Sequence, residues 1–326
     1  MPVDPSPLVS VVLASYNGER FLREQLESIL QQTYKNLEII AVDDFSTDSS
    51  AEILMEFARR DQRIRFFRNE SNLGYTANFE RGLRLAKGDF IAPCDQDDLW
   101  FPGKIARLLE AMGGTGNTII EGISPGEGGA AGTGPELVFA DSELIDAAGR
   151  SLGVRLSDRK QMPGFDDPLT YAIGGSAPGH GMLFRRELLQ RCLPFPPHIP
   201  FDYWLGYIAT CRQPLVYLDE VLVLYRQHSN NVFGLSVKGK KRKSAARASN
   251  EVLRRKMRLL ADACPLELPQ RKVYESLCRS YSSFSPANNF RRMLLFFRHR
   301  DKLLHYKKKP EWRKWLFCWK TFFMLQ

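Results

Sequence analysis

The sequence has no apolar run long enough to cross a bilayer. A membrane-spanning helix needs roughly 18 to 20 consecutive apolar residues, and the best stretch, Trp315–Leu325, is shorter and contains Lys320. The amino terminus also lacks a basic segment followed by a long apolar one, since the first apolar stretch, Val9–Ala14, is strand-sized. We therefore expect neither a transmembrane span nor a secretory signal peptide.

Cysteine and phosphate-loop patterns are also missing. None of the six cysteines forms a C-x-x-C pair, which argues against a zinc ribbon. Their scattered positions are typical of free thiols in a reducing compartment. The glycine-rich segment 113–135 is not followed by G-K-[ST], so we interpret it as a flexible surface loop and not as a phosphate-binding loop.

The net charge of +9 conceals an asymmetry between two parts of the chain. Residues 1–235 hold 22 Lys/Arg and 31 Asp/Glu, whereas residues 236–326 hold 24 and 6. A basic tail on an acidic body indicates an anionic partner, either membrane lipid or nucleic acid. Basic residues stand beside Trp and Phe in 290–297 and 312–323, which suits a helix lying on a membrane surface. A charged helix that packs its apolar side on the body is the alternative.

Strand and helix patterns alternate along the first hundred residues. Short apolar, β-branched runs predict buried parallel strands, and apolar residues at helical spacing predict helices between them. The order β-α-β-α-β-α-β predicts an α/β fold with an open, mostly parallel sheet flanked by helices. The basic tail has the pattern of further helices. The predicted strands are 9–14, 37–42, 64–67, 89–94, 137–140, 215–217 and 221–226.

Polar clusters follow three of these strands, at 15–18, 43–48 and 95–98. Open α/β sheets bind their ligands beyond the carboxyl ends of the strands. Asp95 and Asp97, two positions apart, can hold a hard divalent cation such as Mg²⁺ or Mn²⁺ through oxygen. Such a cation would neutralise charge on a departing diphosphate. A solvated acidic turn is the alternative.

Residues after the first two strands suit a nucleotide base. Asp44 can accept the imide N–H of a uracil or thymine ring. Tyr16 can stack on the same ring, with Ser15 beside it at the end of the first strand. The alternatives are helix capping for Asp44 and core packing for Tyr16.

The second half of the chain contains three more candidates. Asp202, beside the aromatic residues Tyr203 and Trp204, can act as the general base that deprotonates an acceptor hydroxyl, with helix capping as the alternative. His180 lies between two glycines, so its backbone can approach a ligand closely, or it simply forms a turn. His228 follows a strand and suits either a metal or phosphate ligand or a structural histidine.

Taken in order, these segments resemble the family 2 glycosyltransferases with the GT-A fold, over roughly residues 8–234. Asp95–Asp98 matches the D-x-D site of that family. The branch that resembles rhamnosyltransferases commonly has His-Asp-Trp-Trp where this chain has Phe201–Trp204. The other matching segments are 9–17, 30–44, 46–48, 72–74 with Asn78, and 86–89 in the first half, and 181–187, 201–205, 217–220 and 224–231 in the second.

The resemblance implies an inverting, metal-dependent transfer of rhamnose or another hexose from a dTDP- or UDP-sugar. It implies that the donor base binds at Asp44, with Tyr16 nearby. It also implies that Asp202 is the base and that His228 closes over the phosphates. We assign donor binding to Ser15, Tyr16, Asp44, Asp95 and Asp97, the metal to Asp95, Asp97 and His228, and the acceptor to His180, Tyr203 and Trp204.

We therefore expect a GT-A domain at 1–235 and a basic aromatic helical tail at 236–326. The domain divides into a donor half at 1–112, the insert at 113–135 and an acceptor half at 136–235. The expected acceptor is a glycan or polyprenyl-linked glycan of cell-surface polysaccharide synthesis, at the inner face of the cytoplasmic membrane. We expect the tail to bind an anionic membrane and the protein to bind no nucleic acid. A nucleotidyltransferase and a non-catalytic membrane-surface module are the alternatives.

Overall fold

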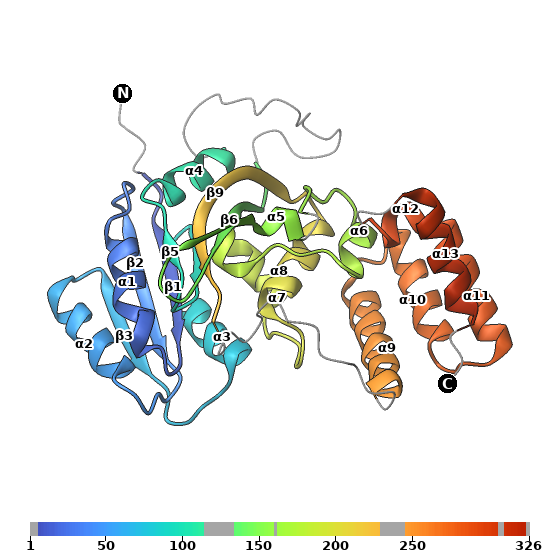
Figure 1. Cartoon of the computed structure of the whole chain (residues 1–326), viewed down its shortest axis with the longest axis horizontal. Coiled ribbons are helices and arrows are strands. Elements are labelled where there is room, and N and C mark those ends of the chain that lie inside the picture. The colour runs from blue at the N-terminus through green and yellow to red at the C-terminus, as the bar shows by residue number, and fades with distance from the viewer. Residues whose placement is uncertain (1–5, 114–133, 160–161, 229–244, 306–309, 324–326) are drawn as a thin grey trace. The chain divides into compact units, whose positions relative to one another are not determined.

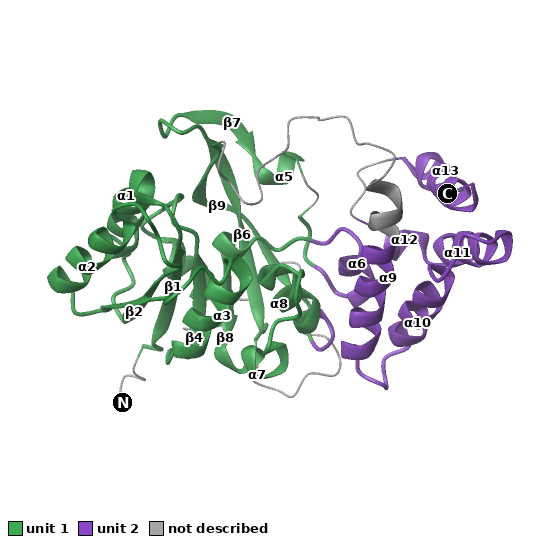
Figure 2. Ribbon diagram, turned by 90° about the horizontal axis from the view of Figure 1, so that it is seen from below, with its two compact units in different colours: residues 1–164, 176–209, 213–232 green, residues 165–175, 210–212, 233–326 purple. Residues whose placement is uncertain are grey.

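The computed structural model describes residues 6–113, 134–159, 162–228, 245–305 and 310–323. The chain divides into two compact units (Figure 2). Unit 1 consists of residues 1–164, 176–209 and 213–232, and unit 2 of residues 165–175, 210–212 and 233–326. Most of the glycine-rich insert lies outside the described residues, as do positions 229–231 and the basic run 238–243.

Unit 1 is built around one open sheet (Figure 1), whose nine described strands include the four predicted in the first hundred residues. The strand order is β3-β2-β1-β4-β8-β6-β9-β5, and β7 pairs with β6. The first four strands are parallel neighbours, so their carboxyl ends lie along one edge. The predicted α/β sheet is confirmed. These strands are β1 (Val9–Ser15), β2 (Leu37–Asp43), β3 (Ile64–Arg68) and β4 (Phe90–Cys94).

The second half of the sheet is mixed. Strand β8 lies antiparallel between β4 and β6, and β5 is antiparallel to β9. The two strands predicted at 215–217 and 221–226 are one strand, β9, whose register against β6 shifts at Asp141. The bounds are β5 (Leu99–Trp100), β6 (Leu137–Ile145), β7 (Ser151–Arg155), β8 (Met182–Arg185) and β9 (Val216–Arg226).

Helices cover both faces of the parallel strands. Alternate residues of β1 point to opposite faces, so Val11 packs in the core that also contains residues of α1, α2 and α4, whereas Val12 faces α3. A Cβ atom at Gly82 of α3 would lie 2.5 Å from Val12 Cγ1, so glycine permits this close packing. The helices are α1 (Glu19–Leu30), α2 (Ser50–Arg60), α3 (Tyr75–Leu85), α4 (Lys104–Ala111), α5 (Leu156–Arg159), α7 (Leu189–Cys192) and α8 (Phe201–Thr210), with 3₁₀ turns η1 (Gly179–Gly181) and η2 (Arg186–Leu188).

Unit 2 is helical. Asp167 caps α6 by accepting a hydrogen bond from Leu169 N at 2.7 Å, and it also binds the side chains of Gln270 and Lys302. One buried carboxylate therefore joins three elements of the unit. No helix among the described residues is both long enough and apolar enough to cross a bilayer. The helices are α6 (Pro168–Ala172), α9 (Ala245–Ala263), α10 (Gln270–Ser280), α11 (Pro286–Arg298), α12 (Arg300–Leu303) and α13 (Glu311–Phe322).

Candidate functional site

The three polar clusters predicted at the strand ends meet at the carboxyl edge of the parallel strands. Gln96, in the turn after β4, accepts hydrogen bonds from Ser15 Oγ at 3.1 Å and from Tyr16 N at 2.8 Å. Asn17 N donates to Ser46 Oγ, in the loop after β2, at 2.9 Å. The loops after β1, β2 and β4 are therefore joined by direct hydrogen bonds.

Gln96 connects the acidic turn to the loop after β1. Its amide also donates to the backbone oxygen of Tyr16 at 3.1 Å. A Cβ atom at Gly18 would lie 2.2 Å from Gln96 Oε1. A side chain at position 18 would therefore displace the Gln96 amide from its hydrogen bonds, which explains why glycine stands there.

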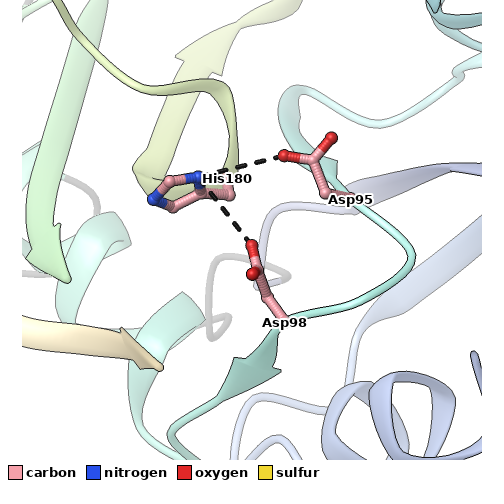
Figure 3. Close-up of side chains that lie close together, drawn as sticks. All are labelled: Asp95, Asp98 and His180. Carbon is pink, nitrogen blue, oxygen red and sulfur yellow. Dashed lines mark ion pairs between the residues drawn. The ribbon is translucent and has the colours of Figure 1, made fainter. Parts of the chain in front are cut away.

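Asp95 and Asp98 of the turn form a compact group of possible metal ligands with His180 (Figure 3). Asp95, Asp98 and His180 each offer one ligand atom, and these atoms lie within 4.8 Å of one another. His180 Nδ1 is 3.9 Å from Asp95 Oδ2 and 3.8 Å from Asp98 Oδ2. His180 comes from η1, so the second half of the chain contributes directly to the acidic turn.

The turn concentrates negative charge in a buried place. Burial, followed by the nearby Asp97 and Asp202 carboxylates, raises the pKa of Asp95 to about 8. Burial, followed by the Asp97 and Asp95 carboxylates, also raises the pKa of Asp98 well above its ordinary value. Asp98 Oδ2 is buried and has no hydrogen-bond partner among the described residues. Clustered carboxylates with an unsatisfied oxygen fit a divalent cation, which favours oxygen ligands and would offset their repulsion.

Asp97 and His228 form a second part of this site. His228 Nε2 lies 2.7 Å from Asp97 Oδ2, and the histidine ring rests 5.0 Å from the ring of Phe21. The side chains of Asp97 and His228 are 13% and 11% exposed, whereas that of Asp98 is fully buried. The structure thus brings together Asp97 and His228, and separately Asp95, Asp98 and His180.

Two buried basic residues support the site, Arg226 at the turn itself and Lys104 at His180, and the sequence analysis identified neither. Arg226, at the end of β9, donates from its side-chain Nε to the backbone oxygen of Asp97 at 2.8 Å. Its backbone N–H donates to Asp98 Oδ1 at 3.0 Å. Lys104, at the start of α4, donates to the backbone oxygen of His180 at 2.5 Å. Burial lowers the pKa of Lys104 to about 7.

The sequence contains a signal that could have identified each of these two basic residues. Lys104 falls in phase with the apolar residues Ile105 and Leu108 on the buried side of α4. Arg226 directly follows the apolar run at the end of β9. A charged residue in phase with core residues indicates a buried role, because such residues are rarely buried unless they have partners.

Asp202 lies in the first turn of α8, close to the acidic turn. Its Oδ2 accepts a hydrogen bond from Gly179 N at 3.3 Å, next to His180. Helix α8 begins at Phe201, so Asp202 is its second residue and Pro200 occupies the capping position. The charge of Asp202 also contributes to the raised pKa of Asp95, and the neighbouring His180 connects this end of α8 with the acidic turn.

The residues proposed for the nucleotide base differ in exposure. Tyr16 is 46% exposed, so it is not a core residue. Asp44 is 2% exposed, and its oxygens accept hydrogen bonds from the backbone N–H groups of Leu73 and Gly74, both at 2.8 Å, and from Asn69. The Asp44 carboxylate therefore holds the loop before α3, and its contact with a base stays a prediction.

The two aromatic residues after Asp202 also differ. Tyr203 is partly exposed, whereas Trp204 is 7% exposed and donates its indole N–H to the backbone oxygen of Cys192 at 3.1 Å. Trp204 thus packs in the interior beside Tyr207. Of this pair only Tyr203 is partly exposed, and its contact with an acceptor stays a prediction.

The sequence model of glycosyl transferase family 2 matches residues 10–193, more than half of the chain. The chain belongs to glycosyl transferase family 2. Among its relatives, the uncharacterized glycosyltransferase RT0329 of Rickettsia typhi is 28% identical over 229 residues, which cover 68% of this chain and 65% of the relative. TuaG of Bacillus subtilis, named for teichuronic acid biosynthesis, is 37% identical over 106 residues, or 32% of this chain and 42% of TuaG.

A solved structure supports the fold assignment. The structure of S. aureus TarS residues 1–349, in complex with UDP-GlcNAc, matches this family 2 chain with a TM-score of 0.56. The match covers 97% of this chain and 80% of the TarS chain, at 18% sequence identity. At this identity the likeness concerns the fold, and the predicted GT-A type of α/β sheet is confirmed.

Proposed function

We propose that the protein transfers a hexose, with inversion, from a nucleotide-diphosphate sugar to a hydroxyl of a glycan or polyprenyl-linked glycan at the inner face of the cytoplasmic membrane. One observation carries this proposal. Asp202, from the second half of the chain, accepts a hydrogen bond from Gly179 N, and the adjacent His180 lies with Nδ1 3.9 Å from Asp95 Oδ2 in the acidic turn. A candidate base and a candidate diphosphate site therefore converge in a member of family 2.

The comparisons support the substrate class. TarS was solved with UDP-GlcNAc, which supports a nucleotide-sugar donor for this chain. The name of TuaG supports a part in the synthesis of a surface polysaccharide. Rhamnose from dTDP-rhamnose rests on the resemblance of the second half alone, and a UDP-sugar is the other donor to test.

For the metal, we assign Mg²⁺ or Mn²⁺ to Asp95, Asp97 and His228. An ion that also binds a diphosphate must be reached from outside, and these three side chains are partly exposed. Asp98 and His180 are more deeply buried, so we assign them the role of orienting the Asp95 carboxylate. When bound, the ion would offset the negative charge that develops on the departing diphosphate.

The chain itself supplies the base and the positioning groups. The Asp202 carboxylate takes the proton of the acceptor hydroxyl, while Gly179 N–H holds one of its oxygens in place. The acceptor oxygen then bonds to the anomeric carbon as the bond to the diphosphate breaks on the opposite face, which inverts the configuration. Such catalysis depends on orientation and electrostatics, without a covalent intermediate.

We also propose a binding position for the nucleotide beside the acidic turn. We assign the base to the exposed ring of Tyr16, which Gln96 fixes through both backbone groups of that residue. The loop held by Asp44 forms the other side. Ser15 is buried against Gln96, so its part in donor binding is to support Tyr16.

The test is a product assay on the full chain. The protein would be incubated with Mn²⁺ or Mg²⁺, a panel of dTDP-, UDP- and GDP-sugars, and polyprenyl-linked glycans. We expect one donor to release its nucleoside diphosphate in a reaction that chelator stops. Release of pyrophosphate would show a nucleotidyltransferase instead. Absence of both release and donor binding in thermal-shift assays would favour the non-catalytic module.

A further inference from the structure

Helices α11 and α13 of unit 2 pack against each other and share one exposed aromatic surface. Phe297 of α11 lies with its ring centroid 5.1 Å from Trp315 and 5.9 Å from Trp319 of α13. The inner sides of the two helices bury residues such as Phe296 and Cys318. We call the outer surface the tryptophan face, and it consists of Phe290, Leu294, Phe297, Trp312, Trp315, Leu316, Trp319 and Phe323.

The spacing of these residues explains why they share a surface. On α13 the three tryptophans stand at positions 312, 315 and 319, and on α11 the apolar residues stand at 290, 294 and 297. Residues three, four or seven apart lie on one side of a helix. Trp312, Trp315 and Trp319 are 57%, 45% and 52% exposed. Single exposed apolar residues are ordinary, but a contiguous patch of large ones marks an interaction surface.

The charges beside this face select its partner. Arg291, Arg298, Arg313 and Lys320 are exposed and adjoin aromatic residues of the face in the sequence. Among the described residues, no carboxylate forms an ion pair with any of these four. By contrast, Glu311, the acidic residue of α13, is bound by Arg300 and Lys314. The face therefore joins indole rings, which favour the boundary between water and lipid, with cations free to meet anionic groups.

We propose that the tryptophan face binds the surface of an anionic lipid bilayer, with α11 and α13 lying in the plane of the headgroups. Helices with an apolar aromatic side and a basic rim adopt this position. The surface is argued from unit 2 alone, so it does not rest on the proposed sugar transfer. It also assigns a defined set of side chains to the membrane contact, without the basic run at 238–243.

The tryptophans provide a direct measurement on the intact protein. The chain has five. Trp100 and Trp204 are 4% and 7% exposed, while the other three all belong to the tryptophan face. We expect vesicles of phosphatidylglycerol and phosphatidylcholine to shift the emission to the blue and to protect it from acrylamide. Vesicles of phosphatidylcholine alone should do so much more weakly.

Variants can distinguish membrane binding through the tryptophan face from attraction by the overall charge of the protein. Because each cation near an anionic bilayer strengthens binding about fivefold, R298Q/K320Q should weaken cosedimentation with anionic vesicles about 25-fold. R59Q/K87Q, which removes two exposed cations of unit 1, should leave it unchanged. W315S/W319S should also abolish most binding, whereas L266S, at an exposed leucine outside the face, should not. Far-ultraviolet circular dichroism would confirm that each variant is folded.

Two results would overturn the proposal. The first is vesicle binding that W315S/W319S and R298Q/K320Q leave intact. The second is a dimer, seen by sedimentation velocity, that depends on Trp315 and Trp319 and binds no vesicles, because the face would then contact a second copy of the chain. Transfer to a soluble acceptor should be equal in the wild type and W315S/W319S, so failure of this surface would be distinct from failure of the enzyme.

Discussion

Arg226 donates a hydrogen bond from its guanidinium to the backbone oxygen of Asp97 at 2.8 Å, although β9 and the acidic turn are distant in the sequence. The same guanidinium binds Glu24 at 2.7 Å and lies 4.6 Å from the ring of Phe21. Arg226 is 1% exposed. It is therefore a positioning residue that fixes the turn carrying Asp97 and Asp98.

We expect R226K to destabilise the protein and to weaken metal binding. A lysine cannot reproduce the separate donors of the guanidinium, and each lost hydrogen bond involving a charged group costs about 2 kcal/mol. Urea denaturation would measure the stability, and calorimetric titration with Mn²⁺ would measure the affinity. R150K, at an arginine whose side chain is 80% exposed, is the control. Unchanged Mn²⁺ affinity in a less stable R226K would show a purely structural arginine.

The two possible sets of metal ligands can be told apart at their histidines. If Asp95, Asp97 and His228 hold the ion, H228A should weaken Mn²⁺ binding by at least about tenfold, because loss of even an outer-shell partner of a ligand costs about that much. H180A should have a smaller effect. H198N is the matched control, because His198 is exposed and asparagine tolerates its φ of 65°. The opposite order of effects would assign the ion to Asp95, Asp98 and His180.

Loss of the candidate base should affect the chemical step alone. General base catalysis contributes about 10² to 10⁴ in rate, so D202N should lower kcat within that range. Because the Asp202 carboxylate is held by Gly179 N–H, outside the loops that we assign to the nucleotide, we expect the Kd for the donor to stay the same. Stopped-assay kinetics and thermal-shift titration would measure the two quantities. D219N, at an exposed carboxylate of β9, serves as the control, and full turnover in D202N would remove the assignment.

A carboxylate at the opposite end of the strands should govern stability in acid. Glu38 accepts hydrogen bonds from Ser10 Oγ, from the backbone N–H of Lys87 and from Arg65. Burial by itself would raise the pKa of Glu38, but these partners together bring it below the ordinary value of 4.5. The folded state thus binds fewer protons than the unfolded state, and the stabilisation is complete above pH 4.5 and lost as the pH falls through the folded pKa.

We therefore expect E38Q to be less stable than the wild type at pH 7. The difference between the two should shrink as the pH falls below 4.5. Urea denaturation at pH 7, 5 and 4 would measure it. The control is E52Q, at an exposed glutamate of α2. A difference that does not change with pH would show that Glu38 acts through shape and not through its charge.

The sequence predicted the first half of the sheet better than the second. Strands β1 to β4 are apolar runs bounded by polar turns, so each can be recognised from its own residues without knowledge of its neighbours. Strand β5 has two residues and β8 four, so neither shows a period. The register shift in β9 lies at Asp219 and Glu220, whose charges made one strand look like two.

The site was predictable in its location but not in its burial. The rule for strand ends placed Asp95, Asp97 and Tyr16 at one edge. Nothing in the sequence distinguished partly exposed Tyr203 from buried Trp204, because both lie in one aromatic helical segment. The roles of Lys104 and Arg226 also depend on tertiary contacts, since a buried charge is defined by the partners that the fold brings to it.

The pairing of β5 with β9 sets an order of assembly. It joins Leu99 to Leu224 and Trp100 to Val223, residues more than 120 positions apart, whereas β1 pairs with β2 over a short separation. Contacts between distant residues form later because closing a long loop costs more entropy. Pulse-labelled hydrogen exchange should thus protect Val11 before Phe101, whose N–H donates to the backbone oxygen of Leu222 in β9 at 3.1 Å, and simultaneous protection would contradict this order. During synthesis, β1 and β2 can therefore pair before β9 has left the ribosome, whereas the contacts of Arg226 with the acidic turn cannot form until then.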